Sequence, residues 1–146
     1  MADVVSLERI MPASAPRVFA MVTTPENMVR WWGHDDMSVP DHNLDFSQPG
    51  PWHAVMQKPD GTKLMVSGEV TEVEPPRFVS FTWAWHDGGP GGPRGTETKV
   101  TIEISPEGDN QAKMTLRHFD LGTDTARAGH SKGWLSIFDK LEKGLA

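Results

Sequence analysis

Two histidines in the second half of the chain are the residues whose type and position best suit chemistry. His118 continues the apolar face that Met114 and Leu116 form on a predicted strand, and His130 lies one helical turn before Trp134. Both side chains are therefore expected to point into the space between a sheet and a helix. An imidazole placed there can hydrogen-bond a ligand carbonyl or hydroxyl, or act as a general base near neutral pH. The alternative is a pair of buried, fully hydrogen-bonded histidines that hold the helix to the sheet.

Tryptophan is the second notable residue type, with 6 Trp in a chain that has no Tyr and no Cys. Trp31, Trp83, Trp85 and Trp134 are candidates for the wall of an aromatic pocket, because an indole offers a large apolar surface and one N–H donor. The competing interpretation is ordinary core packing, and a residue in a pocket wall is itself part of a core. The absence of Cys excludes disulfides, thiolate nucleophiles and Cys-ligated metals.

A metal site is the less favoured interpretation of the polar segment that follows Gly33. His34, Asp35 and Asp36, followed by Asp41 and His42, combine imidazole with carboxylates, and such a set suits Zn, Mn or Fe. The segment has no His-x-x-x-His pair on a helix, and a polar loop explains its composition more simply. We therefore expect no metal and no cofactor.

Two further motifs lack the context that their chemistry requires. Residues 129–133 fit the G-x-S-x-G pattern of hydrolases, but Ser131 falls inside a predicted helix, whereas the mechanism needs a strand and a sharp turn before the serine. The segment 87–95 is rich in Gly and Pro but lacks the Gly-Lys-Ser/Thr of a phosphate-binding loop. It is interpreted as a long hairpin loop, with a gate over a cavity mouth as the alternative.

Length and charge narrow the class of protein. The 146 residues suit a single domain over 1–146. The formal net charge of -6 argues against general nucleic-acid binding and against docking on anionic lipid. The first residues lack the basic and apolar regions of a signal peptide, and no apolar run reaches membrane-spanning length. A cytoplasmic protein without membrane insertion is therefore expected.

Alternation of apolar and polar residues predicts a series of strands. The connections between the later strands are too short for crossover helices, so the pattern indicates an antiparallel meander. Two short helices are predicted after the first strand, one capped by Ser14 and one that starts at Pro25 and stops at Gly33. The predicted strands cover residues 4–11, 52–57, 63–73, 78–86, 99–105 and 112–119.

A long amphipathic helix, capped by Thr123 or Asp124, is predicted to close the chain. Gly129 and Gly133 each weaken it by about 1 kcal/mol relative to Ala, but they also remove bulk where another group can approach. The helix covers the apolar face of the meander, which gives an α+β fold with a bent sheet around one helix and a gap that suits a small molecule. Its apolar stripe consists of Ala126, His130, Trp134, Ile137, Phe138, Leu141 and Leu145.

Several ordered segments resemble the START-like (SRPBCC, birch-pollen-allergen-like) superfamily, in a branch similar to the C-terminal domain of the activator of heat-shock protein 90 ATPase. The resemblance implies a helix-grip fold, with a seven-stranded antiparallel sheet, two short helices after the first strand and a long C-terminal helix. Gly50-Pro51-Trp52 departs from the Gly-Gly pair that the family often carries there. The segments are Thr24-Pro25-Glu26 with Trp31-Trp32-Gly33, residues 68–76, Phe81-Thr82-Trp83, residues 97–101, His118-Phe119 and residues 130–134.

The combined interpretation is a module that binds a small, mostly hydrophobic molecule between the sheet and the C-terminal helix. One alternative is a cyclase or hydrolase-type enzyme with a cavity histidine as general base. Another is a co-chaperone-like regulator of heat-shock protein 90 ATPase, which is disfavoured because the chain lacks the additional N-terminal domain of such activators. The expected ligand-binding residues are His118, His130, Trp134, Trp83, Met114, Leu116 and Trp31.

Overall fold

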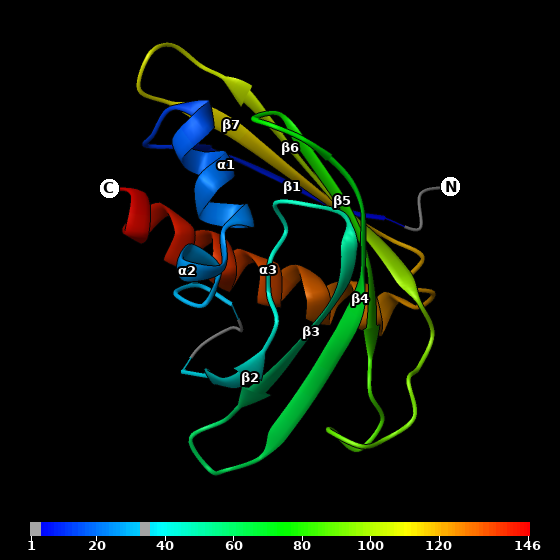
Figure 1. The fold of residues 1–146 in the computed structure, drawn as a ribbon. Coiled ribbons are helices and arrows are strands. Elements are labelled where there is room, and N and C mark those ends of the chain that lie inside the picture. Colours follow the sequence, from blue (N-terminus) through cyan, green and yellow to red (C-terminus); the bar gives the residue numbers. More distant parts are fainter. Residues whose placement is uncertain (1–3, 33–35) are drawn as a thin grey trace.

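The strands join into one antiparallel sheet that curves around a long helix in the computed structural model, which describes residues 4–32 and 36–146 (Figure 1). The helices are α1 (Ala15–Thr23), α2 (Pro25–Met28) and α3 (Asp124–Leu145). The sheet order is β1-β7-β6-β5-β4-β3-β2, so the predicted α+β fold is confirmed. The strands are β1 (Val4–Met11), β2 (Ser38–His42), β3 (Gly50–Gln57), β4 (Lys63–Glu74), β5 (Phe78–Trp85), β6 (Thr98–Pro106) and β7 (Ala112–Phe119).

Strand β2 is an edge strand that the alternation of residues did not predict. It pairs with β3, and its register shifts between Ser38 and Asp41. No residue of β2 is buried, and Pro40 removes one backbone donor. A strand without a buried face carries no alternation of apolar and polar residues, so the sequence gives no signal for it.

Helix α2 ends at Met28, so the prediction that it continues through Trp32 is wrong. Trp31 and Trp32 follow in a turn and are each only 2% exposed. The indole Nε1 of Trp31 donates to the backbone oxygen of Met21 at 2.7 Å, which fixes the turn against α1. The apolar residues that suggested a longer helix are therefore buried in a compact turn. The predicted stop at Gly33 lies outside the described residues.

An aromatic cluster forms the centre of the core on the concave side of the sheet. Trp83 and Phe81 come from β5 and Trp52 from β3, and they meet Phe46 and Trp32 from the connecting segments. Neighbouring ring centroids in the cluster lie between 4.4 and 5.9 Å apart. Tilted and edge-to-face contacts at these distances stabilise a core beyond simple burial.

Helix α3 packs tightly over only part of its length. From Trp134 onward its apolar face is buried, whereas Ala126 and His130 near its start are only half-buried. Arg9 on β1 joins the C-terminal half of α3 to the sheet through ion pairs to Asp139 at 2.7 Å and Glu142 at 3.1 Å. In the described part of the chain, no helix combines the length and the apolar character needed to span a membrane.

The two predicted helix caps give a matched test of stability. The side chain of Thr123 accepts a hydrogen bond from the backbone N–H of Ala126 at 3.0 Å, whereas Ser14 stands at the N-cap of α1 without a side-chain cap bond. Thr123→Ala is therefore expected to lower the free energy of unfolding by about 1 kcal/mol. Ser14→Ala should leave it nearly unchanged. Urea unfolding of both variants checks this, and an equal loss in the two would contradict it.

Candidate functional site

A cavity of about 270 Å³, partly open at the surface, lies between the first half of α3 and the concave face of the sheet. The sheet contributes Trp83 and Trp85 from β5 and Met56 from β3, and the segment after α2 contributes Trp32 and Met37. The helix contributes Ala126, Gly129, His130, Gly133, Trp134 and Ile137. The wall is thus built almost wholly from apolar and aromatic side chains.

Small residues on α3 explain why the cavity is there. Ala126, Gly129 and Gly133 occupy the stretch of helix that faces the wide indoles of β5. A Cβ atom added at Gly129 would meet nothing within 4 Å. The helix therefore supplies too little volume to fill the space in front of Trp83 and Trp85, and interiors are otherwise close-packed.

The cavity wall includes three of the seven predicted ligand-binding residues, Trp83, Trp134 and His130. Met114, Leu116, His118 and Trp31 are instead buried in the surrounding core, each at most 2% exposed, and are not part of the wall. Their predicted contact with a ligand has no support in the geometry. Sequence reasoning missed the wall residues Trp32, Met37, Met56 and Ile137. A signal was present for Met56, because it follows Trp52 and Ala54 on one face of β3.

His118 is a fully satisfied link between α3 and the sheet. The hydroxyl of Thr98 donates to the backbone oxygen of Trp83 at 2.9 Å, so it accepts from His118 Nε2 at 2.8 Å. The other ring nitrogen, Nδ1, accepts from Trp134 Nε1 at 3.1 Å. Burial, and then the neighbouring His130, lowers the pKa of His118 to about 3. The imidazole is therefore neutral and holds its proton on Nε2.

His130 carries its proton on the opposite ring nitrogen. Its Nδ1 donates to the backbone oxygen of Ala126 at 2.8 Å, and its Nε2 accepts from Trp85 Nε1 at 3.0 Å. Burial lowers the pKa of His130, and the hydrogen bond to the Ala126 carbonyl opposes that effect. The two imidazole rings lie 4.9 Å apart at 76°. Both histidines thus match the structural alternative, with no ring nitrogen left unpaired.

The other motifs provide no chemistry within the described residues. Residues 129–133 lie entirely inside α3, so Ser131 is not on a strand-to-helix turn. The described residues contain no group of three His, Cys, Asp or Glu that could hold a metal ion. Asp36 is exposed and Asp41 pairs with His53 at 3.5 Å, while His34 and Asp35 of the predicted cluster lie outside the described residues.

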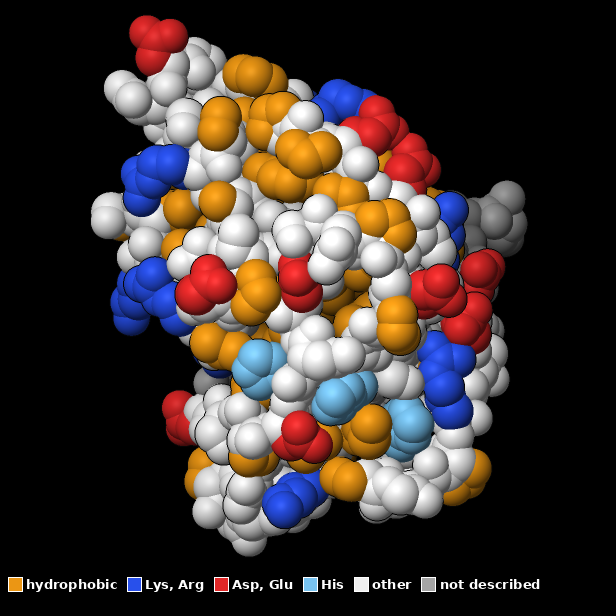
Figure 2. Space-filling model, in the orientation of Figure 1, with side chains coloured by type: hydrophobic (Ala, Val, Ile, Leu, Met, Phe, Trp, Pro, Cys, Tyr) orange, Lys and Arg blue, Asp and Glu red, His pale blue; other side chains and the backbone are white. Residues whose placement is uncertain are grey.

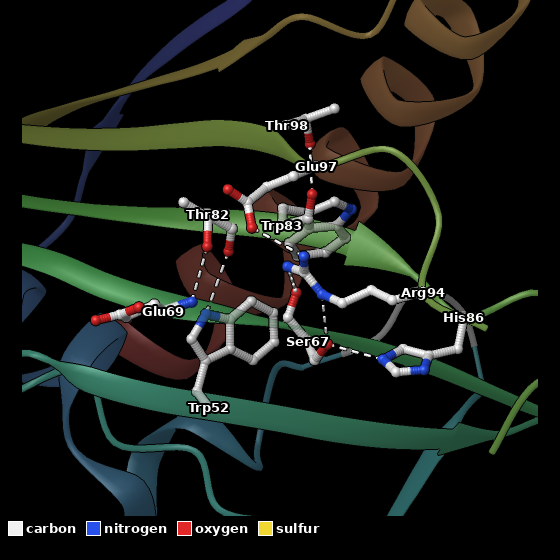
Figure 3. A network of polar contacts seen from close by, with 9 residues as sticks. All are labelled: Trp52, Ser67, Glu69, Thr82, Trp83, His86, Arg94, Glu97 and Thr98. Atoms are coloured by element: carbon white, nitrogen blue, oxygen red, sulfur yellow. Dashed lines mark hydrogen bonds and ion pairs between the residues drawn. The ribbon is translucent and has the colours of Figure 1, made fainter. Parts of the chain in front are cut away.

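The side chain of Arg94 fastens the end of the loop 87–95 to strand β4 (Figure 3). Arg94 donates from Nε to the hydroxyl of Ser67 and from Nη2 to its backbone oxygen, both at 3.0 Å. A third contact joins Arg94 to Glu97 at 2.8 Å, and His86 Nε2 lies 2.8 Å from the Ser67 hydroxyl. Ser67 follows the buried Val66 on β4 and so faces away from the cavity. This favours the hairpin-loop interpretation over a gate.

Positively and negatively charged side chains are mixed on one face of the molecule. On the face shown in Figure 2, Lys and Arg side chains form separate groups with acidic side chains near several of them. Side chains of both signs are thus interspersed on this face of a chain whose formal net charge is -6.

The chain matches the model of the family "Activator of Hsp90 ATPase homolog 1-like protein" over residues 12–146. The chain belongs to this family. It is similar to the AHSA1 protein from Silicibacter pomeroyi, with 38% identity, a TM-score of 0.91 and coverage of 97% of this chain and 96% of that chain. No curated protein sequence matches it.

More distant solved structures share the fold of this Hsp90-activator-like family. A protein from Nitrosomonas europaea has 24% identity and a TM-score of 0.74, with 96% of this chain and 92% of that chain covered. A protein from Mycobacterium smegmatis has 16% identity and a TM-score of 0.82, with coverage of 99% and 91%. The predicted START-like resemblance is confirmed, and this fold is typically a ligand-binding one.

The neutral state of His118 predicts that the fold loses stability as the pH falls. Its pKa is about 3 in the folded chain against an ordinary value of 6.5, so between these values the unfolded chain binds more protons. The free energy of unfolding then drops by up to about 1.4 kcal/mol for each pH unit below 6.5, until the folded pKa is passed. His118→Gln, which donates and accepts without titrating, should remove this part of the loss. Urea unfolding at pH 7 and pH 4.5 checks it, and equal losses for both proteins would contradict it.

Proposed function

We propose that this chain binds a compact, mostly apolar molecule in the cavity between α3 and the sheet. The observation that carries the proposal is a partly open space beside the exposed Gly129, lined by indoles and methionines next to a tightly packed core. An apolar molecule placed there removes its own surface and that of the wall from water, which contributes about 25 cal/mol for each Å² buried.

The size of the cavity indicates the size of the ligand. Pockets for drug-sized ligands span about 300–1,000 Å³, and this cavity holds about 270 Å³. A molecule of one or two fused rings fits this volume, and flat rings suit a wall that contains four indoles. The expected location of this activity in the cytoplasm stays a prediction.

Catalysis by a cavity histidine is the weaker candidate. A general base needs a free lone pair on a ring nitrogen within reach of the substrate. In His130 that lone pair accepts the indole N–H of Trp85, and in His118 it accepts that of Trp134. A regulator of a chaperone ATPase is supported only by the wording of the family description. An unchanged ATPase rate of Hsp90 in the presence of the chain would count against it.

A bulky residue at Gly129 tests the proposed site directly. Gly129→Phe should fill the cavity and abolish the binding of one- and two-ring apolar compounds, because the new ring occupies their place. Ala128→Phe is the matched control, since the neighbouring Ala128 is exposed on α3 and does not line the cavity. A ligand at 100 times its Kd adds about 2.7 kcal/mol to the stability of the folded chain, so thermal unfolding with and without each compound gives the readout.

The proposal predicts opposite results for the two variants. The wild-type chain and Ala128→Phe should both gain several degrees in Tm with the same compounds, and Gly129→Phe should gain none. If no compound stabilises the wild-type chain, or if Gly129→Phe responds as the wild type does, the cavity is not a binding site.

A further inference from the structure

We infer that the ligand of this cavity is an uncharged ring compound that carries a hydrogen-bond acceptor, such as a ketone oxygen or a pyridine-type nitrogen. The inference rests on the proposed function and narrows the class of ligand. It follows from two properties of the described residues that line the cavity: none of them is Lys, Arg, Asp or Glu, and two of them have an unpaired indole donor.

The described part of the wall offers no partner for a charged ligand. None of the described residues that line the cavity is Lys, Arg, Asp or Glu. The single titratable side chain is that of His130, which is neutral and has both ring nitrogens hydrogen-bonded within the protein. A carboxylate or ammonium group in this space would lose its hydration without gaining an opposite charge, which is strongly unfavourable.

Two of the described residues that line the cavity have an unpaired buried polar atom, and both of these atoms are donors. Of the four indoles that line the cavity, Trp85 donates to His130 and Trp134 donates to His118. The Nε1 atoms of Trp32 and Trp83 are buried and have no hydrogen-bond partner. Trp31 and Trp52, the two indoles that do not line the cavity, donate to the backbone oxygens of Met21 and Thr82. Among the described residues, unpaired indole donors therefore occur only on side chains that line the cavity.

A buried N–H without an acceptor is unfavourable, and the usual remedies are absent here. Each nitrogen has less than 1 Å² exposed to water, so it lies beneath the cavity surface and no water pairs with it. Trp32 lies edge-on to Trp52 and to Phe46, so the face of a ring is the competing weak acceptor. A ligand acceptor reaches either nitrogen only if the indole ring turns toward the cavity, and it then satisfies that donor better than a ring face does.

Three compounds with the same bicyclic skeleton separate these alternatives. Tetralin has no acceptor, 1-tetralone adds a ketone oxygen, and 1-aminotetralin is a cation at neutral pH. Kd values for each are measured with the full chain by calorimetry. Tetralin is the more hydrophobic compound, so the quantity compared between proteins is the ratio of its Kd to that of 1-tetralone.

Variants without the indole N–H show whether these donors cause a preference for 1-tetralone over tetralin. Replacing both tryptophans, Trp32→Phe with Trp83→Phe, should lower the ratio about tenfold, and each single variant should lower it by part of that. Met56→Leu is the control, because it changes the wall without removing a donor, and it should leave the ratio unchanged. The cation should bind to none of these proteins.

A second measurement needs no variant and so does not depend on the variants folding. The chain has 6 Trp and therefore six indole N–H resonances in a ¹⁵N-correlated spectrum. On saturation with 1-tetralone, the two resonances that belong to Trp32 and Trp83 should move downfield, as expected when an N–H gains an acceptor. Saturation with tetralin should not move them in this way.

The outcomes distinguish this inference from the proposed function. If tetralin and 1-tetralone both bind but neither the ratio nor the indole resonances respond to the ketone, the acceptor requirement is wrong and the apolar site stands. Tight binding of the cation would also overturn the inference. If neither neutral compound binds the wild-type chain, the inference falls together with the proposed site.

Discussion

The position of α3 on the sheet depends on one buried chain of hydrogen bonds. Trp134 of α3 donates to His118 on β7, His118 donates to Thr98 on β6, and Thr98 donates to the backbone oxygen of Trp83 on β5. Each of these groups would be costly to bury alone. These hydrogen bonds all form only when the imidazole of His118 is neutral and α3 lies in one register. Burial therefore fixes both the protonation state of His118 and the position of α3.

The cavity results from the position on α3 at which this series of hydrogen bonds reaches the helix, namely Trp134. On the C-terminal side of Trp134, large side chains such as Phe138 and Leu141 fill the space down to the sheet. On the N-terminal side the helix carries Ala126 and Gly129, while β5 still presents Trp83 and Trp85. The register that pairs Trp134 with His118 thus holds the narrow part of the helix in front of the widest side chains of the sheet, and the space between them cannot close.

The fold was predictable where one face of an element is buried along its whole length. Strand β5 alternates Val79, Phe81 and Trp83 with smaller or polar residues, and the predicted strands on either side of it follow the same rule. The alternation gave no signal for β2, because its exposed residues follow the edge of the sheet. The sequence also predicted too late an end for α2, since Trp31 is anchored by a hydrogen bond to Met21 and not by helical packing.

The candidate site was predictable only in part, because alternation indicates which face of a strand is inside and not what stands opposite each residue. Met114 and Leu116 are on the inner face as expected, but they belong to the filled part of the core. His118 and His130 do lie together, yet their roles depend on partners within about 3.5 Å, which no spacing in the sequence reveals. The same holds for the indoles: all six Trp have the same donor, and only the three-dimensional packing leaves those of Trp32 and Trp83 without an acceptor. The ligand preference that we propose for this cavity therefore depends on which indole donors are already paired within the fold.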